Sequence, residues 1–310
     1  MIKISYLFFW YENMDDEFYF SRYIKHHFGD MKIVNHNDNP DILFVSVFGY
    51  NLDYIKQINA KIKIFFSGEN EFYHFNNSYL FKDESLKENF DIVLNFKYNN
   101  TRFPLWILYY KYLDYDENDN IITFIQSSYD KNVKKEKEFL TTLLSNSDSR
   151  QNNLRPYLYN FMSTYDKVIC ASKLFNNYPK ICDGHDEKIK HISKSVFNIC
   201  PENSSGEGYF TEKMFQALEA GTIPIYWASN FPEVNIINRN KYIFCDINDS
   251  NNIQKTIDDA ITNKEIRQTY IDGDVFTKDA KKYLKTYYDN LKNNIKTQMD
   301  KKNISYNLPL

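Results

Sequence analysis

The sequence lacks the features that mark membrane-spanning, secreted and nucleic-acid-coating proteins. No apolar run in its 310 residues approaches the roughly 18–20 residues that a membrane-spanning helix needs. The apolar stretch at residues 4–10 is soon followed by acidic residues and has no small-residue cleavage site, so it predicts a buried strand and not a signal peptide. The net charge of −3 argues against a protein that coats nucleic acid, although a small anionic ligand needs only one or two local cations.

Cysteine is scarce and is not arranged for metal binding. The four cysteines form no C-x-x-C pair, and no histidine stands at zinc-finger spacing from them. They are Cys170, Cys182, Cys200 and Cys245. This pattern favours a reduced setting. We therefore expect a cytoplasmic protein that associates at most peripherally with the inner face of a membrane, and we expect no nucleic acid among its partners.

The sequence does contain a regular alternation of short apolar runs and longer amphipathic stretches. The runs are rich in Ile, Val, Phe and Tyr and apolar on both faces, as buried parallel strands are. They cover residues 3–10, 42–48, 62–67, 91–96, 121–126, 167–171, 195–200, 223–227 and 242–245. The predicted helices cover residues 17–27, 133–144, 156–165, 211–220, 253–263 and 279–296. Such alternation predicts doubly wound α/β domains.

The length of the chain and its 43% hydrophobic residues are sufficient for two domains. The acidic run at residues 114–120 is the clearest linker, so we predict a first domain at residues 1–117 and a second at residues 118–277. In the remaining segment, residues 278–310, apolar side chains fall on one helical face and lysines fill much of the other. This predicts a terminal helix that packs back toward the first domain, with a role at a membrane surface as the alternative.

The chemistry is concentrated in residues 197–229, which read FNICPENSSGEGYFTEKMFQALEAGTIPIYWAS. The pattern predicts a strand that ends at Cys200, a polar loop with two glycines, and a helix that begins with Thr211 as its N-cap and is ended by Gly221. The free N–H groups and partial positive charge of a helix N-terminus suit a phosphate, and Lys213 in the first turn adds a full charge. In open α/β sheets, ligands lie at the carboxyl ends of the strands, where this loop is expected.

Spacing alone leaves a second interpretation open, namely an ordinary connection between a strand and a helix. No P-loop pattern G-x-x-x-x-G-K-[ST] is present, and the G-E-G of the loop lacks the third glycine of a dinucleotide-binding fingerprint. Glu212 is placed to accept hydrogen bonds from sugar or ribose hydroxyls, but a glutamate at a helix start is common. Residue types are therefore needed to decide between the two interpretations.

The residue types in this segment are more specific than their spacing. They read F-x-x-C-x-E-N-S, then G-Y-x-T-E-K, then I-P-I-Y-W, which resembles the signature of the α-1,3/4-fucosyltransferases, the GDP-fucose-dependent enzymes of glycosyltransferase family 10. Gln216, where aspartate is common, and Ala228, where glycine follows the tryptophan, depart from the usual pattern. Weaker likeness extends to IFFSGENEFY at residues 64–73 and RPYLYNFMSTYDKV at residues 155–168. The resemblance implies a GT-B fold, in which two Rossmann-like domains face each other across a cleft.

The resemblance also implies roles for residues of the second domain, which would bind the donor GDP-fucose. Arg155 and Lys213 would hold the diphosphate, where fixed cations stabilise the charge that grows on the leaving group. Arg150 is the rival of Arg155 for this role. Further candidates for contact with the nucleotide sugar share the motif loop: Asn203, Tyr209, Glu212 and, as a secondary candidate, Glu202.

The first domain would bind the acceptor. Glu69 matches the general base of an inverting transfer, in which a single displacement needs one base to take the proton from the attacking hydroxyl. His74 is close to it in sequence and is a secondary candidate for the acceptor side. The implied reaction moves L-fucose from GDP-β-L-fucose to a hydroxyl of a GlcNAc or Glc unit in a glycan, in α-1,3 or α-1,4 linkage. A GT-B enzyme for another GDP-sugar and a non-catalytic nucleotide-sugar-binding module are the alternatives.

Aspartate pairs with D-x-D spacing hold Mn²⁺ or Mg²⁺ in many glycosyltransferases of the other main fold. Two such pairs and one looser pair occur here, at Asp114/Asp116, Asp272/Asp274 and Asp246/Asp249. Linker and turn chemistry explains each of them. We therefore expect no metal ligands and no required cofactor, with cationic side chains acting in place of a divalent metal.

Overall fold

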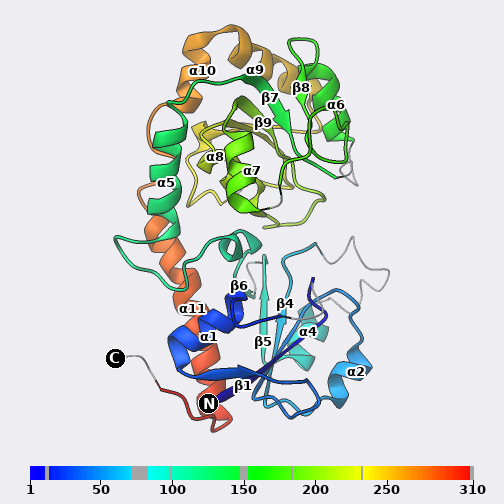
Figure 1. Cartoon of the computed structure of the whole chain (residues 1–310), viewed down its shortest axis with the longest axis vertical. Coiled ribbons are helices and arrows are strands. Elements are labelled where there is room, and N and C mark those ends of the chain that lie inside the picture. Colours follow the sequence, from blue (N-terminus) through cyan, green and yellow to red (C-terminus); the bar gives the residue numbers. More distant parts are fainter. Residues whose placement is uncertain are drawn as a thin grey trace. The chain divides into compact units, whose positions relative to one another are not determined.

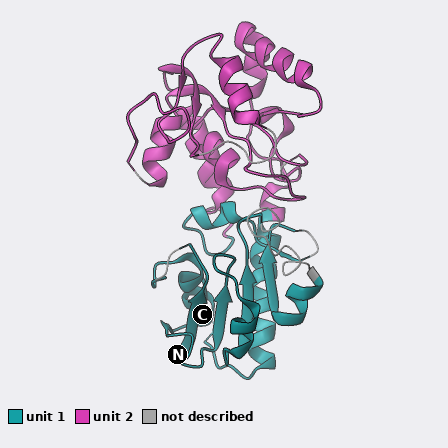
Figure 2. Cartoon of the chain, turned by 90° about the vertical axis from the view of Figure 1, so that its right-hand side faces the viewer, with its two compact units in different colours: residues 1–115, 284–310 teal, residues 116–283 magenta. Residues whose placement is uncertain are grey.

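The structure, a computed structural model, describes residues 1–10, 14–70, 83–97, 100–146, 153–182, 184–231 and 233–307. The chain forms two compact units (Figures 1 and 2). Unit 1 comprises residues 1–115 and 284–310, and unit 2 comprises residues 116–283, coloured teal and magenta in Figure 2. The chain therefore leaves unit 1 for unit 2 and returns to unit 1 within its last helix, α11 (Ala280–Lys301). The predicted divisions lie nearby, after residues 117 and 277.

Unit 1 is built on a six-stranded sheet in which all neighbouring strands are parallel, in the order β2-β1-β3-β4-β5-β6. The strands are β1 (Ile2–Leu7), β2 (Met31–Ile33), β3 (Ile42–Val45), β4 (Ile62–Phe66), β5 (Ile92–Asn95) and β6 (Thr101–Arg102). Its other helices, among the described residues, are α1 (Tyr19–Phe28), α2 (Leu52–Gln57), α4 (Asp83–Asn89) and the 3-10 helix η2 (Leu105–Tyr109). Every residue of β3 and β5 is buried, as runs that are apolar on both faces predict.

The two faces of this sheet have different packing partners. Phe20 of α1 contacts Phe44 and Phe66, with ring centroids 4.9 and 5.1 Å apart. On the other face, Val45 and Phe65 pack with apolar residues of α2 and α4. Neighbouring residues of one strand thus point to opposite layers, as the period of two in a strand requires. Figure 1 shows α1 and α2 on opposite sides of the unit 1 strands.

Helix α11 buries its apolar face within unit 1. Leu284, Leu291 and Ile295 are fully buried. The Tyr288 hydroxyl donates to the Tyr112 carbonyl at 3.2 Å, and the Tyr288 carbonyl accepts from the Tyr23 hydroxyl of α1 at 3.4 Å. Both partners of Tyr288 thus come from the first 115 residues of the chain. Among the described residues, no helix combines the length and the apolar character that crossing a bilayer requires.

Unit 2 is built on a second parallel sheet, with five strands in the order β11-β10-β9-β7-β8. The strands are β7 (Phe139–Leu143), β8 (Val168–Ile169), β9 (Ser195–Ile199), β10 (Ile223–Tyr226) and β11 (Ile243–Phe244). The helices are α5 (Ile121–Asn132), α6 (Leu154–Met162), α7 (His185–Ile192), α8 (Glu212–Glu219), α9 (Ser250–Thr262), α10 (Lys264–Ile271) and the 3-10 helix η3 (Arg239–Lys241). Apolar residues of the strands, α6 and α9 form one core.

Two predicted elements at the start of unit 2 are wrong. The strand predicted at residues 121–126 is the first half of α5, and the segment 133–144, predicted as a helix, contains β7. Asn120 caps α5 by accepting a hydrogen bond from the Thr123 amide at 3.1 Å, and the buried residues then follow helical spacing as far as Tyr129. Periodicity cannot assign a short apolar run such as IITFI to a strand or a helix, so the cap was the decisive signal. The short strands β2 and β6 have no counterpart among the predicted strands.

The turn between α8 and β10 requires the glycine at its centre. Gly221 has a φ of +66°, in the left-handed region that favours glycine, and it follows the C-cap Ala220. The glycine predicted to end this helix is therefore confirmed. A Cβ atom at Gly221 would overlap the backbone of Asn132 and Val133, so the end of α5 packs directly on this turn. This close approach helps to hold α8, whose N-terminus carries the site described next.

Candidate functional site

The residues of the motif come together at the carboxyl end of the unit 2 sheet. Strand β9 ends at Ile199, the polar loop follows, and α8 begins directly after Thr211, which occupies the N-cap position. The loop contains Glu202, whose side chain is completely buried. The Glu202 amide donates to the Trp227 carbonyl at 2.9 Å, which attaches the loop to the residue that follows β10. The parallel pairing of β9 and β10 thus places both ends of the motif at one edge of the sheet.

The Glu202 carboxylate accepts four hydrogen bonds. Its Oε1 atom accepts from the Thr211 amide at 2.8 Å and from the Tyr226 hydroxyl at 2.7 Å. Its Oε2 atom accepts from the Thr211 hydroxyl at 2.7 Å and from the Lys213 ammonium group at 3.1 Å. A buried carboxylate needs such donors to offset its lost hydration. Because the donors belong to β10 and to the first turn of α8, Glu202 joins the start of the helix to the neighbouring strand.

Thr211 occupies the predicted N-cap position, but its side chain makes no capping hydrogen bond to the helix. The hydroxyl donates to Glu202 and accepts from Lys213 at 2.7 Å. The amide and the hydroxyl of Thr211 therefore both donate hydrogen bonds to the buried Glu202 carboxylate. The start of α8 is held by a glutamate nine residues earlier in the chain, which local capping patterns do not describe.

The two predicted diphosphate ligands lie in this region. Arg155, at the start of α6, is 3% exposed and donates to the Pro201 carbonyl at 2.9 Å and to Asn203 Oδ1 at 2.7 Å. Lys213 is held by Glu202, and its side chain is 19% exposed. Arg155 and Lys213 both line one small cavity at the end of β9. The structure thus brings Arg155 into contact with Asn203 and places Arg155 and Lys213 on one cavity.

The charges around this cavity stabilise one another. Burial opposes the charge of Lys213, but the Glu202 and Glu212 carboxylates raise its pKa above the ordinary lysine value. Burial also opposes ionisation of Glu212, but Lys213 and Lys188 hold the pKa of Glu212 below the ordinary value. Burial and the Glu202 carboxylate raise the pKa of Tyr226 well above its usual range, so this hydroxyl keeps its proton and donates.

The other predicted site residues have different settings. Tyr209 is 1% exposed. Glu69 belongs to unit 1, where it follows β4 at the carboxyl end of that sheet and is half-buried. The Ser67 hydroxyl donates to the Glu69 carbonyl at 2.6 Å, which shapes this turn. Arg150 and His74 lie outside the described residues.

The predicted aspartate pairs contain members that stabilise turns and helix ends. Asp116 Oδ1 accepts from the amides of Asn118 and Asp119 at 2.8 and 2.9 Å. Asp249 caps α9 by accepting from the Asn252 amide at 3.0 Å. These are the local side-chain-to-backbone bonds that aspartate makes in turns and N-caps.

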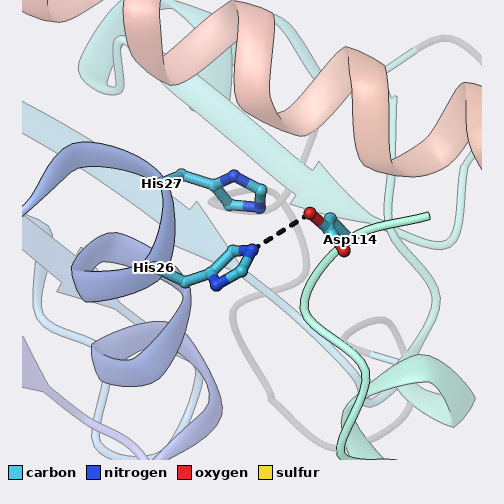
Figure 3. Close-up of side chains that lie close together, drawn as sticks. All are labelled: His26, His27 and Asp114. Carbon is cyan, nitrogen blue, oxygen red and sulfur yellow. Dashed lines mark hydrogen bonds and ion pairs between the residues drawn. The ribbon is translucent and has the colours of Figure 1, made fainter. Parts of the chain in front are cut away.

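Asp114 meets two histidines at the end of α1 (Figure 3). His26 Nε2 lies 3.0 Å from Asp114 Oδ2, and His27 Nε2 donates to the Leu113 carbonyl at 2.9 Å. Potential ligand atoms of His26, His27 and Asp114 come within 4.8 Å of one another, an arrangement that could hold a metal ion. The His26–Asp114 and His27–Leu113 contacts also explain, without a metal ion, why these side chains lie together. Burial lowers the pKa of His27 to about 4, so its imidazole is neutral at pH 7.

Two parallel sheets in separate units, with an anion-suited helix start in the second, are features of the GT-B fold. Solved structures share this fold. A crystal structure of an α1,3-fucosyltransferase superposes with a TM-score of 0.65 at 20% identity, covering 96% of this chain and 90% of that one. A crystal structure of an α1,3-fucosyltransferase with GDP-fucose gives a TM-score of 0.61 at 19% identity, covering 94% and 90%. The predicted GT-B fold class, with two Rossmann-like domains, is confirmed.

The sequence comparisons show similarity to one family within this class. Residues 133–272 match the model of glycosyltransferase family 10 (fucosyltransferase), C-terminal part. The α-(1,3)-fucosyltransferase FucT of Helicobacter pylori is 27% identical over 284 residues, which cover 83% of this chain and 55% of that protein. The chain thus spans about half the length of the curated relative that it matches. The resemblance of its motif to glycosyltransferase family 10 is confirmed.

One residue of the motif, Glu202, supports other residues of the site. The sequence alone did not distinguish this role from ligand binding. Glu202, a secondary candidate for donor contact, has its carboxylate enclosed by Thr211, Lys213 and Tyr226, so in this structure it positions other site residues. Tyr226 was not among the predicted site residues, although it belongs to the I-P-I-Y-W part of the motif. A buried glutamate needs hydrogen-bond donors, and the tyrosine at the end of the next strand was the signal for one of them.

Replacing Glu202 with Gln is expected to lower the free energy of unfolding of unit 2 by about 3 kcal/mol. The glutamine amide has no negative charge to pair with the Lys213 ammonium group. Its NH₂ group is a hydrogen-bond donor, and the groups around it are also donors. Urea denaturation followed by tyrosine and tryptophan fluorescence would measure the change. Glu207→Gln is the matched control, since Glu207 is exposed in the same loop and its loss should change stability by less than about 0.5 kcal/mol. Equal stability of the two variants would contradict the central role of Glu202.

The setting of His27 predicts acid sensitivity of unit 1. Its folded-state pKa of about 4 lies below the ordinary value of 6.5, so the unfolded chain binds the proton more readily and stability falls as the pH drops from 6.5 toward 4. We expect a loss of about 2 kcal/mol between pH 7 and pH 5 from this group. His27→Gln, which keeps a donor for the Leu113 carbonyl, should remove most of this loss in denaturation curves. The control His26→Gln, at an exposed position, should keep most of the loss of stability at low pH. If His27→Gln has the same pH dependence as wild type, His27 is not the group responsible.

Proposed function

We propose that the chain is an inverting fucosyltransferase that moves L-fucose from GDP-β-L-fucose to a hydroxyl of a GlcNAc or Glc unit in a glycan. The observation that carries this proposal is the Glu202 arrangement, which fixes Lys213 and the start of α8 beside Arg155 at the carboxyl end of a parallel sheet. The names of the relatives, an α-(1,3)-fucosyltransferase and an α1,3-fucosyltransferase with GDP-fucose, support an α-1,3 linkage. An α-1,4 linkage is the alternative.

On this proposal, unit 2 binds the donor. The bond between the fucose C1 atom and the phosphate oxygen breaks, and the leaving GDP takes the bonding electrons. Lys213 and Arg155 offset the charge that grows on this diphosphate, and the N-terminus of α8 adds a partial positive charge. Such groups, held in place before the reaction, need no reorganisation in the transition state. Asn203, Tyr209 and Glu212 are proposed to contact the nucleotide sugar.

Glu69 is proposed as the general base. It takes the proton of the acceptor hydroxyl as the oxygen forms its bond to C1, so one displacement inverts the configuration from β to α. Its place directly after a parallel strand supports the assignment, because functional side chains of α/β units gather at the carboxyl ends of strands. Cationic side chains are proposed to act in place of a divalent metal. A cytoplasmic setting is also proposed, and the free state of all four cysteines supports it.

The proposed donor chemistry predicts transfer without a metal. With GDP-fucose and a panel of GlcNAc-terminated oligosaccharides, we expect a fucosylated product at a rate that excess EDTA leaves unchanged. Mass spectrometry would detect the product, and linkage analysis would distinguish α-1,3 from α-1,4. GDP should raise the melting temperature of the protein more than UDP does. Loss of transfer in EDTA would overturn the metal-free mechanism, and equal effects of GDP and UDP would overturn the assignment of the nucleotide.

The role of Glu69 predicts a loss of rate without a loss of donor binding. Glu69→Gln should lower kcat on the order of 10²–10⁴-fold, the range that a positioned base contributes. The increase in melting temperature caused by GDP should stay the same, because Glu69 is not proposed to touch the nucleotide. Glu84→Gln changes an exposed carboxylate of the same unit and serves as the control. A near wild-type rate for Glu69→Gln would show that another group is the base.

A further inference from the structure

Lys188, on α7, has no role in the reaction as described above, yet it lies beside the donor residues. It lines the small cavity at the end of β9, of about 20 Å³, together with Arg155, Lys213 and Gln216. It also lines a neighbouring cavity of about 460 Å³, whose other walls include Lys173 and Lys180. Because Lys188 lines both cavities, a ligand that occupied both would lie beside its side chain.

The packing of α7 on α8 explains why Lys188 lies there. His185, at the start of α7, places its Nε2 atom 2.8 Å from Glu219 Oε2, and the Gln216 amide donates to His185 Nδ1 at 3.4 Å. Lys188 follows His185 by three residues and therefore lies on the same face of the helix. Two residues of α8, Gln216 and Glu219, thus hold the face of α7 that carries Lys188 toward α8.

The charges near the small cavity favour an anion. Among the described residues, Arg155, Lys188 and Lys213 supply three positive charges, and the nearby carboxylates of Glu202 and Glu212 supply two negative ones. The Glu202 carboxylate is already saturated by four hydrogen bonds. Burial lowers the pKa of Lys188, although Glu212 opposes this, so a further negative charge would stabilise the ammonium form. A bound diphosphate supplies that charge.

The larger cavity has the size and the hydrogen-bond donors that the nucleoside part of such a ligand needs. Its volume is within the range of small-molecule sites, and its described walls offer hydroxyl, amide and ammonium groups but no carboxylate. Besides Lys188, the side chains that carry these groups are Ser145, Asn146, Ser172, Lys173, Asn176 and Lys180. These groups can donate hydrogen bonds to the oxygen and nitrogen acceptors of a nucleoside.

We infer that Lys188 binds the diphosphate as a third cation beside Arg155 and Lys213, and that the nucleoside continues past it into the larger cavity. This inference rests on the proposed function and names a further donor-binding residue for it. The ammonium group would share the charge that develops on the departing GDP, and it would orient the diphosphate between the two cavities.

Lys188→Met tests the ionic contact, and Lys190→Met is its matched control. Lys190 lies on the same helix with its side chain 71% exposed, paired at 3.8 Å with Glu187. By calorimetry, Lys188→Met should bind GDP about tenfold more weakly than wild type, the effect of losing one charge-assisted contact, and Lys190→Met should bind normally. Guanosine, which has no phosphate, should bind all three proteins equally. Equal GDP affinities, or equal losses for GDP and guanosine, would overturn the inference.

A labelling experiment tests the path of the nucleoside. Cys182 lines the larger cavity and is exposed, whereas Cys170, Cys200 and Cys245 are buried. Saturating GDP should slow modification of Cys182 by DTNB in the folded protein about tenfold or more, and Cys182→Ser should abolish the fast phase. Modification at the same rate with bound GDP would exclude the larger cavity as the nucleoside site. A wild-type protein that does not bind GDP at all would defeat the proposed function itself, and this inference with it.

Discussion

One buried carboxylate holds the candidate donor site together. Glu202 has no contact with solvent, and each of its oxygens accepts two hydrogen bonds. Its donors join the first turn of α8 to the end of β10, and its charge keeps Lys213 protonated next to Arg155. An ion in this position is stable only with every partner in place. The same set of contacts therefore determines both the local fold and the direction of the cations.

Much of this fold could be predicted from hydrophobic patterns. The buried strands β3, β4, β9 and β10 are short runs that are apolar on both faces, and helices such as α8 and α9 have clear ends. The failures at residues 121–144 have a physical reason. The run IITFI is apolar enough for either a strand or a helix, and the cap from Asn120 decides for a helix. Strand β7 carries two threonines and obtains its stability from β8 and β9 on either side, which is a long-range effect.

The candidate site was predictable to the extent that its residues are neighbours in sequence. Asn203 and Lys213 lie in one motif, and the structure brings Arg155 to them from α6. Lys188 lies outside the motif, and only the packing of α7 on α8 places it there. The supporting role of Glu202 could not be predicted either, because its hydrogen-bond donors are brought to it by the fold. A glutamate in a polar loop looks like a ligand-binding group until the tyrosine and lysine that surround it are seen.

The path of the chain between the two units also affects the order in which they can form during synthesis. Unit 2 is continuous, so all of its residues are synthesised before the last residues of α11. Unit 1 needs that helix, because Leu284, Leu291 and Ile295 complete its interior. Domains usually fold in the order of their synthesis, with the N-terminal one first. Here the unit that is begun first is the last to be completed, and until then its apolar surface for α11 stays uncovered.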